Sequence, residues 1–197
     1  MLMSFFGPMC LYWPSRVIND EKVPRMNTQV EVRAFVAQDA AQVRELFVKV
    51  NRLLAPPEMK EAFEAYVASS LEAEMDRIEA YYGEREGGFW VAVEGSRLVG
   101  MFGLEPSSAT AMELRRMYVA PDARRRGIAR MMLGYAEDEC RRRNRPTMDL
   151  STSELQADAL SFYRSAGYRL VREEVALSAS NKTLGGGIRR YYFTKPL

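Results

Sequence analysis

Residues 124–130 (RRRGIAR) constrain the fold more than any other part of this chain. They follow an apolar, strand-like stretch over residues 114–119 and a turn at residues 121–122, and a helical pattern of apolar residues begins at Ile128. A strand, a glycine-bearing loop and a helix start together bind anions, because the first amides of a helix have no intrahelical partner and the helix dipole favours negative charge there. Gly127 lets the backbone approach a ligand closely, and the arginines add positive charge. The pattern predicts a site for a phosphate-bearing cofactor.

Length and composition are those of one soluble globular domain. Hydrophobic residues make up 47% of the 197 residues and charged residues 27%, which is ordinary for such a domain. The formal net charge of +2 is too small to indicate a nucleic-acid-binding protein, although ten arginines lie between Arg115 and Arg145. We therefore predict no nucleic-acid partner.

The first 25 residues differ from the rest. Residues 1–13 are apolar and aromatic, but Gly7 and Pro8 interrupt them, and the stretch is too short to span a bilayer. No basic residue precedes the apolar part, so a signal peptide is the minor alternative. We interpret residues 1–25 as a poorly ordered N-terminal extension and residues 26–197 as a single domain with no membrane partner.

The chain contains no histidine. This excludes a Ser-His-Asp triad, a Cys-His nucleophile and a histidine-ligated metal site, so any general base must be a carboxylate, a tyrosine, a lysine or a relayed water. The two cysteines, Cys10 and Cys140, are far apart in the sequence and form no metal or redox motif. We expect Cys140 to be a reduced, semi-buried thiol on a helix, and we predict a cytoplasmic protein without a metal.

Hydrophobic periodicity predicts an α+β chain with a mixed sheet and the element order β-α-α-β-β-β-α-β-α-β-β. The predicted strands are residues 30–36, 89–93, 97–104, 111–119, 147–151, 168–175 and 189–195. The predicted helices are residues 39–55, 58–82, 126–143 and 155–166.

Residues 117–129 contain one motif and residues 159–168 (ALSFYRSAGY) a second, and together they resemble motifs of the GNAT superfamily of N-acetyltransferases. Residues 117–121 (MYVAP) and 124–129 (RRRGIA) are similar to its acetyl-CoA signature, Arg/Gln-x-x-Gly-x-Gly/Ala after a YV-x-P strand end. Residues 159–168 match the A-x-x-F-Y-x-x-x-G-F/Y helix, and the closing RYYFTKPL resembles the last strand. The matches cover roughly residues 30–197 and stand at the family's usual separation. The resemblance implies a GNAT-like fold, with a mixed, mostly antiparallel central sheet flanked by helices.

The resemblance also implies roles for individual residues in binding acetyl-CoA. The pyrophosphate would be held by Arg124, Arg125, Arg126, Gly127, Ile128, Ala129 and Arg130. Met117 and Val119 would offer backbone groups to the pantetheine arm, on a strand that splays from the next one. Tyr163 occupies the place of the general acid that protonates the departing CoA thiolate. Since a tyrosine has a pKa of about 10 and a thiol about 8.5, a hydrogen bond to the thiolate accounts for most of its expected work.

Gln156 departs from the family pattern, which usually has asparagine there. The pattern Thr152-Ser153-x-x-Gln156-x-x-Ala159 is similar to that of a smaller branch of the family, which includes the mammalian cysteine-conjugate and aspartate N-acetyltransferases. Glutamine can still donate to and accept from pantetheine, so we retain it as a cofactor-binding residue. The branch implies a small amino-acid-like or amine acceptor rather than a peptide.

Glu113 is the first candidate for the general base and Glu105 the second. An ammonium must lose a proton before its nitrogen can attack a thioester. Glu113 lies six residues before Val119, which predicts that the two share a face of the sheet. The tetrahedral oxyanion would be met by the Val119 amide.

The leading hypothesis is an N-acetyltransferase that moves an acetyl group from acetyl-CoA directly to a primary amine of a small molecule, amino-acid-like or polyamine-like. The alternatives are acetylation of a protein or peptide amine, a non-catalytic acyl-CoA-binding domain and a nucleic-acid-binding domain. Each motif also has an ordinary structural interpretation: a basic helix start, a core aromatic for Tyr163, a solvated carboxylate for Glu113 and a surface residue for Gln156. A homodimer through exposed sheet edges is left open.

Overall fold

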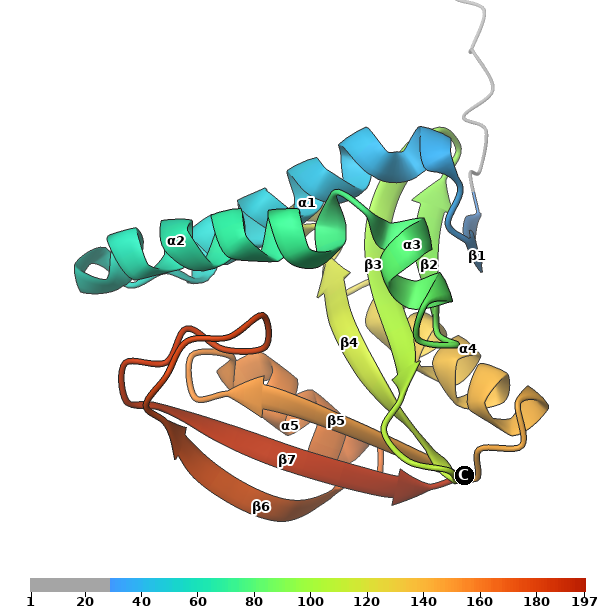
Figure 1. Cartoon of the computed structure of the whole chain (residues 1–197). Coiled ribbons are helices and arrows are strands. Elements are labelled where there is room, and N and C mark those ends of the chain that lie inside the picture. The colour runs from blue at the N-terminus through green and yellow to red at the C-terminus, as the bar shows by residue number, and fades with distance from the viewer. Residues whose placement is uncertain (1–28) are drawn as a thin grey trace, which may run out of the picture.

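Seven strands form one sheet in the computed structural model, which describes residues 29–197 (Figure 1). The strands lie in the order β1-β2-β3-β4-β5-β7-β6, and every neighbouring pair is antiparallel except β4 with β5. Their bounds are β1 Val30–Ala34, β2 Gly88–Glu94, β3 Arg97–Pro106, β4 Ala111–Val119, β5 Thr147–Ser153, β6 Arg169–Ala176 and β7 Ile188–Pro196. The predicted α+β fold with a mixed, mostly antiparallel sheet is confirmed.

The helices follow the predicted order with one difference. Their bounds are α1 Ala40–Leu54, α2 Lys60–Ser70, α3 Ile78–Gly83, α4 Ile128–Arg142 and α5 Ala157–Ser165. The single helix predicted over residues 58–82 is wrong, because a π-helical turn, η3 (Leu71–Met75), separates α2 from α3. A π-helical turn adds a residue to the helical period. Glu74 and Met75 are both buried in this turn, and Glu74 reaches the arginines of β4.

Helices cover both faces of β2, β3 and β4. Phe89 of β2 packs against Tyr82 of α3, with ring centroids 5.3 Å apart. The next residue, Trp90, points to the opposite face and packs against Tyr135 of α4, with centroids 6.3 Å apart. On β3, a Cβ at Gly103 would lie 2.2 Å from the Tyr82 hydroxyl, so only glycine permits this approach of α3. We call the two sides the α3 face and the α4 face.

A β-bulge in β4 reverses the alternation of its side chains. Two residues of β4, one of them Arg116 with φ 51°, oppose a single residue of β3. Glu113 pairs with Glu105, and Val119 pairs with Gly100. Since residues 100 and 105 are five apart on β3, they face opposite sides of the sheet, and so do their partners. The expectation that Glu113 and Val119 share a face is therefore wrong: Glu113 lies on the α3 face and Val119 on the α4 face.

β4 and β5 pair over only part of their length. Their register runs from Ala111 with Thr147 to Leu114 with Leu150, and beyond that point the strands separate (Figure 1). β5 continues to Ser153 by pairing with β7. The predicted splay of the strand that bears Met117 is confirmed.

Three further predictions concern the N-terminal extension, Cys140 and the membrane. The expected N-terminal extension over residues 1–25, with Cys10, lies outside the described residues. Cys140 is a free thiol, as expected, but it is fully buried rather than semi-buried, and burial raises its pKa to about 12. No helix in the described part of the chain has the length and apolar content needed to cross a membrane.

Candidate active site

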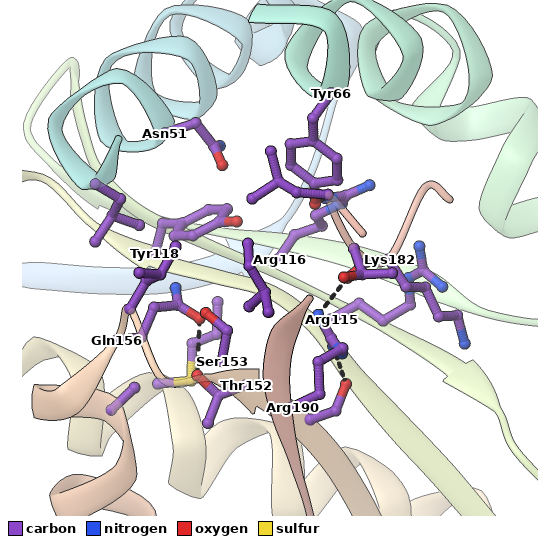
Figure 2. Close-up of a pocket in the computed structure, with 18 of the residues that line it drawn as sticks. Asn51, Tyr66, Arg115, Arg116, Tyr118, Thr152, Ser153, Gln156, Lys182 and Arg190 are labelled. Carbon is purple, nitrogen blue, oxygen red and sulfur yellow. Dashed lines mark hydrogen bonds between the residues drawn. The ribbon is translucent and has the colours of Figure 1, made fainter. Parts of the chain in front are cut away.

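A cleft of about 130 Å³ lies where β4 and β5 separate (Figure 2). α1 and α2 border it on one side and α5 on the other, and the loop of residues 177–187, between β6 and β7, covers it. Four of the predicted site residues line the cleft: Glu113, Met117, Gln156 and Tyr163. The structure therefore brings together the predicted acid, the predicted base and two of the predicted cofactor contacts.

Tyr163 of α5 is buried, with 7% of its surface exposed. Its hydroxyl lies 3.7 Å from the Met117 Sδ and can donate to it, and its ring packs edge-on against Tyr168. Burial raises the pKa of Tyr163 above its ordinary value of 10.0. The phenol therefore stays protonated at neutral pH and is available as a hydrogen-bond donor in the cleft.

The backbone amide of Val119 points into the opening between the strands. The Ala120 amide donates to the Val99 carbonyl at 2.9 Å, so these two residues form a hydrogen-bonded pair. Such pairs alternate with non-hydrogen-bonded ones in antiparallel strands, and Gly100 with Val119 is the next pair. The Val119 N–H is thus directed away from β3, toward the side where β5 has left β4.

Gln156 immediately precedes α5, and its side chain is fixed by a neighbour. The Thr152 hydroxyl donates to the Gln156 Oε1 at 2.7 Å, and Figure 2 shows the two side chains together at the cleft. This hydrogen bond fixes the carboxamide oxygen, so the amide nitrogen of Gln156 is available to donate a hydrogen bond to a ligand in the cleft.

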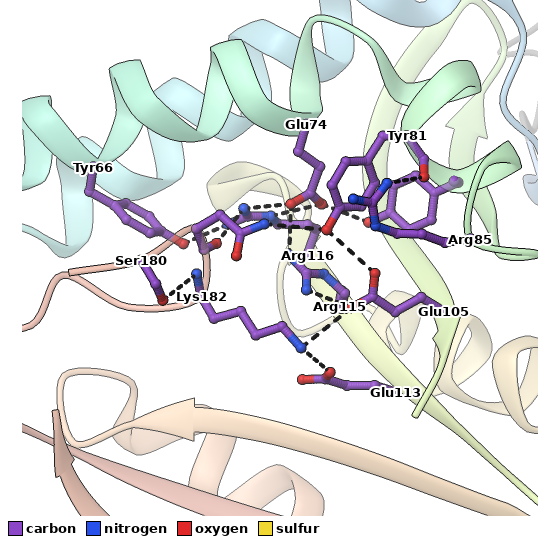
Figure 3. A network of polar contacts seen from close by, with 12 residues as sticks. Tyr66, Glu74, Tyr81, Arg85, Glu105, Glu113, Arg115, Arg116, Ser180 and Lys182 are labelled. Atoms are coloured by element: carbon purple, nitrogen blue, oxygen red, sulfur yellow. Dashed lines mark hydrogen bonds and ion pairs between the residues drawn. The ribbon is translucent and has the colours of Figure 1, made fainter. Parts of the chain in front are cut away.

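The predicted base Glu113 is ion-paired to Lys182 of the covering loop (Figure 3). The same Lys182 Nζ lies 3.3 Å from an oxygen of Glu105, the second candidate. Glu105 also accepts a hydrogen bond from Arg115 at 2.7 Å. Both predicted carboxylates therefore face one ammonium group on the α3 face.

A buried charge network behind this pair was not predicted. Glu74 is fully buried and accepts hydrogen bonds from Arg115 at 2.8 Å, from Arg116 at 2.7 and 3.1 Å and from the Tyr82 hydroxyl at 2.7 Å (Figure 3). Burial alone would raise the pKa of Glu74, but Arg116 and Arg115 hold it below its ordinary value. Arg116 also donates to the Tyr66 hydroxyl at 2.5 Å. Two adjacent arginines in the middle of a largely apolar strand are the sequence signal for such a network.

The loop before α4 has the geometry of an anion site. Gly127 is the N-cap residue with φ 81°, a left-handed conformation that favours glycine, and a Cβ there would meet no atom within 4 Å. The Arg126 guanidinium turns away to bind Glu94 of β2, with one contact at 3.1 Å. Arg124, Arg125 and Arg130 are exposed and make no ion pair among residues 29–197. The free amides of the helix start and these guanidiniums fit a diphosphate.

A model of the acetyltransferase (GNAT) family matches residues 56–168. Rat N-acetyltransferase family 8 member 2 is 26% identical over 136 residues, which are 66% of this chain and 60% of that protein. Rat N-acetyltransferase 8F1 is 31% identical over 123 residues, which are 60% of this chain and 54% of that protein. The chain thus spans between half and two thirds of the length of these relatives.

Two solved structures with the same fold align with this chain over almost their whole length. The Staphylococcus aureus GNAT acetyltransferase aligns with a TM-score of 0.66 and 16% identity, over 86% of this chain and 99% of that one. The Thermoplasma acidophilum PaiA N-acetyltransferase, solved in complex with coenzyme A, aligns with a TM-score of 0.66 and 20% identity over the same shares. At these identities the likeness concerns the fold alone.

Proposed function

Because this chain belongs to the acetyltransferase (GNAT) family, we propose that it transfers an acetyl group from acetyl-CoA directly to a primary amine of a small molecule. The observation that carries the proposal is the opening between β4 and β5, which Tyr163, Gln156 and Glu113 all line. We propose direct transfer without an acyl-enzyme, because the chain has no histidine and Cys140, the one cysteine within residues 29–197, has a fully buried thiol.

The α4 face would take acetyl-CoA, which supplies the acetyl thioester. The backbone from Arg124 to Arg130 would hold the pyrophosphate at the start of α4, with Gly127 giving the close approach. Arg126 contributes its amide rather than its guanidinium, which Glu94 occupies. Met117 and Val119 would hold the pantetheine arm through their backbone, and Gln156 through its carboxamide.

The α3 face would take the acceptor. Glu113 would accept a proton from the acceptor ammonium, and the freed nitrogen would attack the thioester carbonyl. The Val119 amide, directed into the opening, would stabilise the oxyanion. The carbon–sulfur bond then breaks, and Tyr163 would donate a hydrogen bond to the departing thiolate.

The covering loop favours a small acceptor over a peptide. Its Asn181 carbonyl accepts a hydrogen bond from Arg116 at 2.7 Å, and the Asn181 Nδ2 donates to the Tyr81 hydroxyl at 3.3 Å. These contacts tie the loop across the acceptor side and leave a cleft of about 130 Å³. A peptide would need the loop to open.

The nucleic-acid alternative is weaker in the folded chain. Of the ten arginines between residues 115 and 145, Arg115 and Arg116 are buried, and four others bind carboxylates, namely Arg126, Arg141, Arg142 and Arg143. Little of this charge is therefore free for phosphates of a duplex. The cytoplasmic location and the homodimer stay predictions.

Isothermal titration with acetyl-CoA, followed by a screen for CoA release, tests the proposal. The screen compares amino acids, polyamines, aminoglycosides and short peptides as acceptors. Saturable binding together with turnover of a small amine is the expected result. Failure to bind acetyl-CoA at sub-millimolar concentration would rule the function out. Turnover of peptides alone would overturn the small-molecule acceptor in favour of a peptide acceptor.

A further inference from the structure

Lys182 brings a primary amine of the protein itself to the candidate base. Its Nζ binds Glu113 and lies 3.3 Å from Glu105 (Figure 3). A base must come within hydrogen-bond reach of the proton it removes, so an acceptor ammonium would need the position that Lys182 occupies.

The candidate base Glu113 and the buried Glu74 have different charged partners. Both oxygens of Glu74 are taken by Arg115, Arg116 and Tyr82. Glu113, by contrast, has Lys182 as its only charged partner within residues 29–197. Lys182 is thus the charged partner of the candidate base, although its Nζ also lies within ion-pair distance of Glu105.

The loop that carries Lys182 holds its backbone in place while its side chain stays accessible. The Lys182 carbonyl accepts a hydrogen bond from Arg190 at 2.5 Å, and the neighbouring Asn181 carbonyl accepts one from Arg116. The Lys182 side chain is 43% exposed and lines the cleft that Tyr163 and Met117 also line. An unbranched lysine side chain with an anchored backbone can move its amine within this cleft.

We propose that Lys182 is an internal acetyl acceptor, modified in the protein's own cleft; this rests on the proposed function. Glu113 takes one proton from the Nζ ammonium, and the nitrogen lone pair forms a bond to the acetyl carbonyl carbon of acetyl-CoA. The carbon–sulfur bond breaks as the amide forms, and the second proton lost from the nitrogen ends on CoA as its thiol. The product is Nε-acetyl-Lys182 and free CoA.

Acetylation changes the cleft in a defined way. It removes the positive charge of Lys182 and with it the ion pair to Glu113. The carboxylate is then free to bind the ammonium of a diffusing acceptor. The modified protein therefore has an acceptor position that the unmodified lysine fills.

The test is incubation of the full chain with acetyl-CoA, with the acetyl content of each lysine followed by peptide mass spectrometry. Lys195 is the matched reference, because its Nζ also binds a carboxylate, Glu137 at 2.8 Å, but outside the cleft. Lys182 should be acetylated faster than Lys195, at a rate per molecule that does not depend on protein concentration. Glu113→Gln should slow the Lys182 reaction by about a hundredfold and leave Lys195 unchanged.

Two controls make the outcomes decisive. Lys182→Arg, which keeps the charge, should remove the fast acetylation, and Lys195→Arg should not. Modification of Lys182 no faster than Lys195, or equally fast in Glu113→Gln, overturns the proposal. Titration and amine turnover in the same preparation separate the two ideas: binding and turnover without acetyl-Lys182 overturn this inference alone, whereas no binding and no turnover overturn the proposed function as well.

Discussion

The Tyr163 hydroxyl lies 3.7 Å from the Met117 sulfur, across the gap between α5 and β4. The phenol is thus already placed to donate to a sulfur atom beside the stretch that we propose holds the pantetheine arm. Because burial keeps it protonated at neutral pH, its role is that of a donor and not of a base.

Tyr163→Phe should lower kcat roughly a hundredfold, because the departing thiolate loses its donor. Binding of acetyl-CoA should be nearly unchanged, as measured by isothermal titration beside steady-state CoA release. Tyr168→Phe is the matched control: this tyrosine is also buried, but its hydroxyl donates to Glu137 at 3.1 Å, outside the cleft. Equal kcat in the two variants would contradict the assignment of Tyr163.

Gly127→Ala should weaken acetyl-CoA binding and destabilise the protein by about 1–2 kcal/mol, because alanine is strained at a positive φ. The affinity effect arises from a methyl group at the helix start, where we propose that the pyrophosphate approaches. Gly134→Ala in the middle of α4 is the control, since its Cβ also meets no atom but its φ is helical. It should stabilise the helix by about 1 kcal/mol and leave affinity unchanged. The same affinity in both variants would remove Gly127 from the site.

Much of the fold follows from local patterns in the sequence. Both ends of the strand over residues 111–119 agree with the prediction, because apolar residues 117–119 run up to a turn marked by Pro121. The helix over residues 58–82 was predicted wrongly, because its apolar spacing does not reveal that Glu74 is drawn inward. That contact depends on Arg115 and Arg116, about forty residues away in the chain.

The site was predictable where a motif fixes it and not where the loop completes it. Tyr163, Gln156 and Met117 line one cleft as the resemblance implies, because two motifs at a fixed separation carry the geometry. The faces of Glu113 and Val119 were predicted wrongly, because strict alternation fails at a β-bulge. Lys182 was missed altogether, since nothing in its polar, glycine-rich surroundings indicates a partner on β4.

The Arg33–Asp39 ion pair should make stability depend on acid pH. Asp39 accepts hydrogen bonds from Arg33 at 2.7 and 2.8 Å and from the Val36 amide at 3.0 Å. The Arg33 hydrogen bonds hold the pKa of Asp39 below its ordinary value of 3.8. A carboxyl group whose pKa is lowered on folding stabilises the folded state at pH values above its unfolded pKa. This contribution is lost as the pH falls through the pKa of the folded state.

Urea unfolding measured from pH 5 down to about pH 2 should therefore show a falling free energy of unfolding, with a shallower slope in Asp39→Asn. Arg33→Gln should flatten the slope as well, because it removes the cause of the lowered pKa. Slopes equal to that of the unmodified protein in both variants would show that other carboxylates carry the acid sensitivity.

Glu74→Gln should be the most destabilising conservative change in the described chain, because it leaves Arg116 buried without a counter-charge and Arg115 with Glu105 alone. Removal of one partner from a buried ion pair costs about 3–5 kcal/mol, and here one carboxylate serves two guanidiniums. Urea unfolding at neutral pH measures the change. Glu64→Gln, which breaks the exposed pair with Arg52 on α1 and α2, should leave stability close to its original value. Unfolding of the two variants at similar urea concentrations would show that Glu74 does not stabilise the network. Arg116, which binds the covering loop through the Asn181 carbonyl, would then have to be held in place by other contacts.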